Sequence, residues 1–112
     1  MTAPRLTVPL VLEAPERVPD ALGGYRVAWR ALGVLHAQMR ARSGAERSGA
    51  VGPSSVVAWR ITVRGARDGD PRRPRPGQRF RMGGRVFQVE AVAEADPGGL
   101  WLDCAAKEES LS

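Results

Sequence analysis

Few side chains in this sequence could carry out acid–base, nucleophilic or metal chemistry. Cys104 is the only cysteine and His36 the only histidine, so the usual four nitrogen or sulfur ligands of a zinc site cannot be assembled. A serine, histidine and acid triad would need His36, whose sequence neighbours do not suggest such a site. Asp68 and Asp70 could supply part of a carboxylate metal site, but arginines follow and further ligands are missing. The sequence therefore predicts a protein that is not an enzyme and that uses no cofactor or metal.

The remaining charged side chains are mostly arginines, and they are unevenly placed. Residues 40–85 hold twelve arginines against three carboxylates, a net charge of +9, whereas the rest of the chain has a net charge of −4. A positive middle suits contact with a polyanion such as DNA or with an acidic protein face, although the same arginines could simply keep a small domain soluble. Because exposed aromatics do not alternate with these arginines, any DNA contact is expected at phosphates, without sequence preference.

Two arginine-bearing segments are expected to be loops. Residues 42–55 are rich in Gly, Ser and Ala, so they cannot offset their ordering entropy by burying apolar area, and we expect them to be mobile. Residues 65–77 contain three prolines, which exclude a helix or a central strand. The arginine side chains of this second loop are expected to project from the surface into solvent: Arg72, Arg73 and Arg75.

Alternation of apolar and polar residues predicts strands in the second half of the chain. The pattern is clear over 55–64, and it continues over 79–82 and 85–92 on either side of Gly83-Gly84. A Gly-Gly pair between alternating runs is typical of a two-residue hairpin, whose register sets Phe80 opposite Phe87. After a turn at 97–99, residues 100–104 alternate again. Three consecutive antiparallel strands are therefore expected to close the chain.

The first half of the sequence is less decisive. Residues 6–12 alternate as a strand, in which Pro9 requires an edge or a bulge, and 20–24 indicate a turn. The segment from Tyr25 to Arg42 fits both structures, because its apolar residues have helical spacing and also alternate. Gly33 would interrupt a helix, and it could mark a bulge in a long bent strand.

Length and composition limit the organisation of the protein. With 112 residues, 43% apolar and 26% charged, the chain has room for one domain with one modest core. We expect this domain to span 1–112, with loops at 42–55 and 65–77 and a loose tail at 107–112. No apolar run is long enough to span a membrane, no signal peptide is expected at the N-terminus, and a lone cysteine fits synthesis in the cytosol.

The order of these features resembles the head-tail joining (head completion, or stopper) family of tailed bacteriophages and phage-derived particles. The resemblance covers roughly 6–106 and is carried by a series of short motifs: Leu10-Val-Leu-Glu13, Gly23-Gly24, Trp29, Leu32-Gly33, Leu35-His36-Ala37, Trp59-Arg-Ile-Thr-Val-Arg64, Pro76-Gly77-Gln-Arg79, the hairpin from Gly83 to Val89, the turn from Glu94 to Pro97, and the strand from Leu100 to Cys104. The chain departs from the family at His36, where Trp is frequent, at Ala21-Leu22, where a turn such as Asp-Gly is frequent, and in an expanded stretch at 71–76.

The resemblance implies a small antiparallel β-barrel of about six strands, in which the segment from Tyr25 to Arg42 is a strand. It also implies a non-enzymatic virion protein, assembled in the bacterial cytoplasm, that forms a homo-oligomeric ring at the neck of a phage-like particle. Its implied partners are the portal or adaptor protein, the tail terminator or tail tube protein, and packaged double-stranded DNA. In such proteins the loop between the second and third strands can project into the DNA channel, and that position matches 42–55.

A consistent mechanism follows for the two loops. Small residues would let the first loop fold into a crowded channel, where its arginines could meet phosphates and its glycines could act as hinges: Arg42, Gly44, Arg47, Gly49 and Gly52. The second cluster, Arg72, Arg73 and Arg75, is expected to face neighbouring subunits or the adaptor. Two other functions stay open, a stand-alone β-barrel that binds nucleic acid and a regulatory or interaction module.

Overall fold

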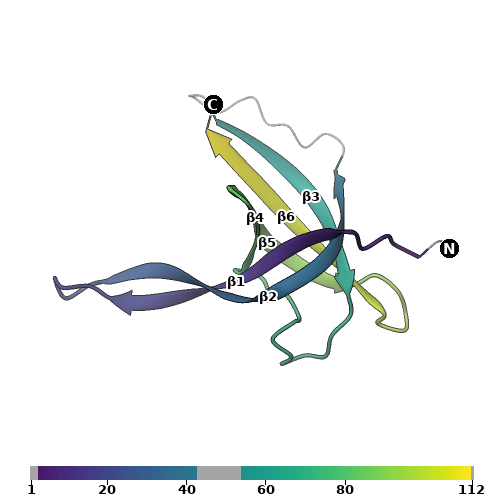
Figure 1. Ribbon diagram of the computed structural model, residues 1–112, viewed down its shortest axis with the longest axis horizontal. Helices are drawn as coiled ribbons and strands as arrows, with labels where there is room; N and C mark the ends of the chain where they lie inside the picture. Colours follow the sequence, from purple (N-terminus) through teal and green to yellow (C-terminus); the bar gives the residue numbers. More distant parts are fainter. Residues whose placement is uncertain (1–2, 43–53, 112) are drawn as a thin grey trace.

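The structure, a computed structural model, describes residues 3–42 and 54–111, and these ranges form an antiparallel β-barrel. The strands close in the order β1-β2-β3-β6-β5-β4 (Figure 1). Their bounds are β1 Val8–Pro19, β2 Tyr25–Ala41, β3 Ser54–Arg64, β4 Arg79–Met82, β5 Arg85–Glu94 and β6 Trp101–Leu111. The predicted all-β fold of about six strands is confirmed. No helix that could cross a membrane occurs in the described ranges.

The segment that fits both helix and strand is strand β2. Its register against β1 changes where Leu12 pairs with Gly33 and Glu13 pairs with Ala31, so Leu32 is the extra residue of a bulge. Gly33 has a φ of +152°, which residues with a side chain rarely adopt. The predicted bulge at Gly33 is therefore present, and it lets a long strand bend around the barrel.

The core fills the inside of the barrel with side chains from all six strands. Phe80 and Phe87 face each other across the β4–β5 hairpin, as their predicted register requires, and both are fully buried. Trp59 meets Phe87 edge to face, with ring centroids 5.9 Å apart, a favourable aromatic geometry. The other buried apolar residues are Leu10, Leu12, Ala37, Ile61, Val63, Val89, Leu102, Cys104 and Ala106.

One part of the structure extends away from the barrel. Strand β1 pairs with β4 only at 11–13, and β2 pairs with β3 only at 37–41, so beyond the barrel 14–19 and 25–31 pair only with each other, as a two-stranded ribbon. We call residues 14–31 the arm; it comprises the ribbon and the turn at 20–24. Figure 1 shows the arm projecting to one side of the barrel. The radius of gyration, 15.4 Å, exceeds the roughly 13 Å of a compact chain of this length, as a projecting arm requires.

A buried ion-pair network fixes the root of the arm. Glu13 lies on the outer side of the barrel, yet it is only 6% exposed, because Arg79 and Arg81 of β4 cover it. The Nε atoms of Arg79 and Arg81 donate to the two carboxylate oxygens at 2.8 and 2.9 Å. Burial alone would raise the pKa of Glu13, but the two arginine hydrogen bonds outweigh it and the pKa is lowered. Arg79 also stacks on Trp29, 4.0 Å from the ring centroid.

Two strands are longer than the sequence predicts. The N-terminal strand continues to Pro19 although β1 contains three prolines, because all three lie outside 11–13, the only stretch of β1 that pairs with β4, and there one edge of the strand needs no partner. The prediction of a loose tail at 107–112 is wrong over 107–111, which pair with β3 in β6. Glu108 is held there by Trp59 Nε1 at 3.1 Å and by two hydrogen bonds from Arg85. The predicted loop at 42–55 is also shorter than expected, since Ser54 and Ser55 belong to β3.

Candidate nucleic-acid interface

An arginine cluster lies where β2 ends, beside the middle of β3. Arg40 and Arg60 are directly opposite each other in the β2–β3 register, and both are exposed. Arg42 follows β2, and its backbone N–H donates to the Ala58 carbonyl at 2.9 Å. Within the described ranges none of the three has a carboxylate oxygen within 4.0 Å. Like charges opposite each other destabilise a sheet, so this arrangement is suited to an anion that binds from outside.

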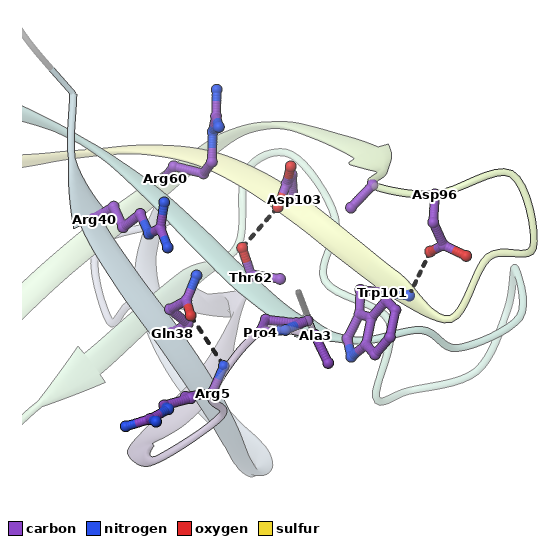
Figure 2. A pocket seen from close by; sticks show the side chains of 11 residues that line it. Ala3, Pro4, Arg5, Gln38, Arg40, Arg60, Thr62, Asp96, Trp101 and Asp103 are labelled. Atoms are coloured by element: carbon purple, nitrogen blue, oxygen red, sulfur yellow. Dashed lines mark hydrogen bonds between the residues drawn. The ribbon is translucent and has the colours of Figure 1, made fainter. Parts of the chain in front are cut away.

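A pocket of about 480 Å³ adjoins the cluster on the outer wall of β2, β3 and β6 (Figure 2). Two hydrogen bonds organise it. Gln38 Oε1 accepts from the Arg5 N–H at 3.0 Å, which holds the N-terminal segment across the wall, and Thr62 Oγ1 donates to Asp103 at 2.7 Å. Arginines line one end of the pocket, and Ala3, Pro4 and Trp101 lie together at the other end beside Asp96. Ala95 and Asp103 complete the lining.

A tight turn positions the apolar end of the pocket. The Asp96 carboxylate accepts the backbone N–H groups of Gly98, Leu100 and Trp101 at 2.9–3.1 Å. These hydrogen bonds favour the charged carboxylate and lower its pKa. Gly99 has a φ of +69°, which only glycine adopts without strain. The turn therefore places Trp101 at the start of β6, where it faces the N-terminal segment (Figure 2).

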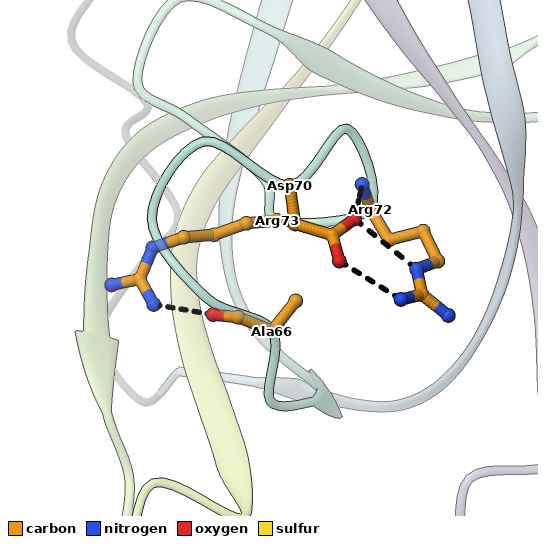
Figure 3. A network of polar contacts seen from close by, with 4 residues as sticks. All are labelled: Ala66, Asp70, Arg72 and Arg73. Carbon is orange, nitrogen blue, oxygen red and sulfur yellow. Dashed lines mark hydrogen bonds and ion pairs between the residues drawn. The ribbon is translucent and has the colours of Figure 1, made fainter.

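The second arginine cluster is split between different roles (Figure 3). Arg72 forms two side-chain hydrogen bonds with Asp70, at 2.8 and 3.1 Å, and these hold the pKa of that carboxyl at about 2. Arg73 turns back into the loop and donates to the Ala66 carbonyl at 2.8 Å, so its side chain is only 20% exposed. Arg75 is exposed. The expectation that all three arginines stand clear of the surface is therefore wrong for Arg73, which braces the loop beside the buried Pro74.

Several predicted site residues lie outside the described ranges: Gly44, Arg47, Gly49 and Gly52. Of the first predicted cluster, the structure places Arg42, and it adds Arg40 and Arg60, which sequence reasoning did not single out. The signal was present, because alternation already assigned Arg60 to the outward side of its strand. Within residues 3–42 and 54–111, no three His, Cys, Asp or Glu side chains gather as a metal site.

Comparison with known proteins agrees with this fold. A sequence profile of the family described as phage head completion protein matches residues 1–109. The chain belongs to this family. A solved chain from the "virion of native gene transfer agent (GTA) particle" is 47% identical, with a TM-score of 0.86, and the match covers 98% of this chain and 100% of that one. No curated protein matches. The resemblance predicted from the sequence is confirmed, and the head completion protein is a structural protein of phage-like particles.

Proposed function

We propose that this head completion protein is the connector, or stopper, at the neck of a phage-like particle. Identical copies form a ring below the portal and adaptor, the ring docks the tail terminator or tail tube, and it helps to retain packaged DNA. The single observation that carries the proposal is the family match over 1–109. The similar chain from a gene transfer agent virion supports a location in the particle.

DNA retention is assigned to the arginine cluster. Arg40, Arg42 and Arg60 bring three exposed positive charges to one end of the barrel wall, where phosphates could pair with them. Such phosphate contacts do not depend on the DNA sequence, as a channel that passes any DNA requires. They weaken as the salt concentration rises. A DNA-gating role for 42–55, with Arg42 and Arg47 toward phosphates and glycine hinges at Gly44, Gly49 and Gly52, stays a prediction.

Contact with the adaptor or the tail is assigned to the loop at 65–77. This loop follows β3, whereas Arg40 and Arg60 lie within the paired parts of β2 and β3, so the two basic regions lie on different elements and can serve different partners. Arg75 is exposed, Arg72 keeps further N–H donors beyond its pair with Asp70, and Arg73 braces the loop that presents them. A carboxylate-rich neighbour fits this surface.

The DNA-retention role is tested by comparing two double variants in purified particles. Arg40→Gln with Arg60→Gln removes charge from the cluster, and Arg64→Gln with Lys107→Gln removes the same charge from exposed positions outside the cluster and outside the loop at 65–77. We expect normal particle numbers for both, but a several-fold loss of nuclease-protected DNA for the first pair, growing with salt. Equal protection in both would contradict the role. Deleting 44–52 tests the predicted gate in the same assay, with leaking particles as the expected result.

The location is tested by imaging the necks of particles that carry a tagged chain. Density for the tag between capsid and tail is the expected result, and its absence would overturn the connector role. A stand-alone nucleic-acid binder would instead be missing from particles, stay small in sedimentation, and bind DNA with a strong salt dependence.

A further inference from the structure

We propose that the tip of the arm docks into the apolar end of the pocket of a second copy of this chain, so that copies join head to tail. Leu22 is the residue that enters the pocket. The inference rests on the proposed ring, and it identifies the two surfaces that join neighbouring copies.

The tip presents an apolar side chain on a rigid turn. Leu22 is 94% exposed, the highest value among the exposed large apolar side chains of the described residues. The turn is already ordered, because Asp20 Oδ1 accepts the N–H groups of Leu22 and Gly24 at 2.9 and 2.8 Å. A rigid turn loses little conformational entropy on binding, which favours docking.

The arm continues this apolar surface toward the barrel. Pairing places Tyr25 beside Pro19, and Val27 two residues further along the same face; they are 62% and 59% exposed. A two-stranded ribbon is marginally stable alone in water, so packing against a partner would stabilise it. Prolines in β1 hinder the addition of another strand at its free edge, so a partner is expected to contact the face and the tip of the arm.

The pocket complements the tip in apolar character and in charge. Ala3, Pro4 and Trp101 lie together at the end beside Asp96, Ala95 also lines the pocket, and this apolar end can take an aliphatic side chain. Three arginines and two aspartates line the pocket, and both carboxylates already accept hydrogen bonds, Asp96 from its turn and Asp103 from Thr62. The lining therefore keeps a net positive charge toward a tip in which Asp20 is the only charged residue of 18–24.

The tip and the pocket lie at opposite ends of the molecule. In Figure 1 the arm reaches one end of the longest axis, which spans 52 Å, and the N-terminal segment and the turn before β6 lie toward the other end. A chain therefore cannot fill its own pocket. A contact between two different surfaces repeats from copy to copy until the ring closes, whereas a two-fold contact stops at a dimer.

Engineered cysteines test this contact in assembled particles. The double variant Leu22→Cys, Ala95→Cys places one thiol on the tip and one in the pocket, and oxidation is expected to give a ladder of disulfide-linked multimers on a non-reducing gel. The native thiol does not interfere, because Cys104 is fully buried and burial raises its pKa to about 12. The matched control, Leu22→Cys with Glu90→Cys, places the second thiol at an exposed position of β5 outside the pocket, and it should give no ladder.

Every other result of the disulfide experiment would overturn the inference, and each result points to a different cause. Dimers from Leu22→Cys alone would mean that arms pair with each other, and a ladder only in the Glu90 control would place the tip elsewhere. No ladder in particles that contain the chain would overturn the contact and leave the connector role intact. Absence of the chain from particles would overturn both.

A second variant tests the chemistry of the contact. Leu22→Asp places a charge where an apolar side chain should be buried, and its incorporation into particles should fall at least tenfold, whereas Leu22→Met should retain it. Because Leu22 contacts almost nothing in the isolated chain, the melting temperature should be unchanged in both variants. Normal incorporation of Leu22→Asp would contradict the proposal.

Discussion

At the scale of single residues, the charged side chains divide into those with partners inside the chain and those without. Glu13 holds two arginines at the root of the arm, and Asp96 holds three backbone N–H groups of a turn. Arg40 and Arg60, by contrast, lie opposite each other on two strands, and neither forms an ion pair within the described ranges. The first kind stabilises the fold, and the second kind is available to an anionic partner.

Glu13→Gln should destabilise the protein by about 2 kcal/mol, because it leaves two partly buried arginines with a neutral acceptor. The pKa of Glu13 is lowered in the fold, so its contribution is complete above the ordinary value of 4.5 and is lost as pH falls through the lower, folded value. The difference in melting temperature between wild type and variant should therefore be constant near neutral pH and shrink below about pH 4.5. Thermal melts across this pH range measure it, with Glu16→Gln as an exposed control.

Cys104 should not react with alkylating agents while the barrel is folded. Its thiol is fully buried, and a pKa raised from 9.0 to about 12 leaves roughly a thousandfold fewer thiolates than in the unfolded chain. Labelling by iodoacetamide at pH 8, followed by mass spectrometry, should be complete in denaturant and slower by at least about a hundredfold without it. Rapid labelling of the native protein would mean that β6 opens often.

At the scale of elements, alternation predicted the strands whose two faces differ. Strand β3 and the β4–β5 hairpin have one buried face, so the register of Phe80 against Phe87 could be predicted from the sequence. Strand β2 could not be assigned from the residues alone, because its first part, 25–31, lies in the arm, where both faces are largely exposed and no alternation is required. The far end of β6 was missed for a different reason, since Glu108 is anchored by Trp59, a residue distant in sequence.

The turn between β4 and β5 depends on one glycine of its pair. Gly83 has a φ of +60°, whereas Gly84 has no positive φ, and a Cβ at either position would meet no atom within 4 Å. Gly83→Ala should therefore cost about 1–2 kcal/mol through backbone strain alone, and Gly84→Ala should cost much less. Denaturant melts of the two variants test this directly. Equal losses would show that the turn differs from the one described.

At the scale of the whole molecule, the site is assembled from segments that lie far apart in the sequence. Residues 3–5, 38–40, 60–62 and 95–103 meet only because β2, β3 and β6 are neighbours in the closed barrel. A single strand pattern cannot show that Arg40 lies opposite Arg60, or that Trp101 lies beside Ala3. The family could be predicted from the order of short motifs, whereas the pocket required the three-dimensional pairing.

We expect the barrel to fold without the arm. None of the fully buried apolar residues of the described ranges lies in 14–31, and the Glu13 network and the stacked Trp29 close the barrel at the root of the arm. Replacing 16–28 by Asn-Gly joins the paired residues Pro15 and Trp29 through a two-residue hairpin. We expect this variant to keep the β-type circular dichroism spectrum and a melting temperature within a few degrees of wild type, because the core is untouched.

The same variant should enter particles at less than a tenth of the wild-type level, because it has lost the tip that joins neighbouring copies. Melting and incorporation together separate the two roles that an arm can have. A large fall in melting temperature would make the arm part of the folding unit, and normal incorporation of a stable variant would show that copies assemble through the barrel walls instead. A stable barrel that no longer assembles is the result that the exposed, proline-edged ribbon predicts.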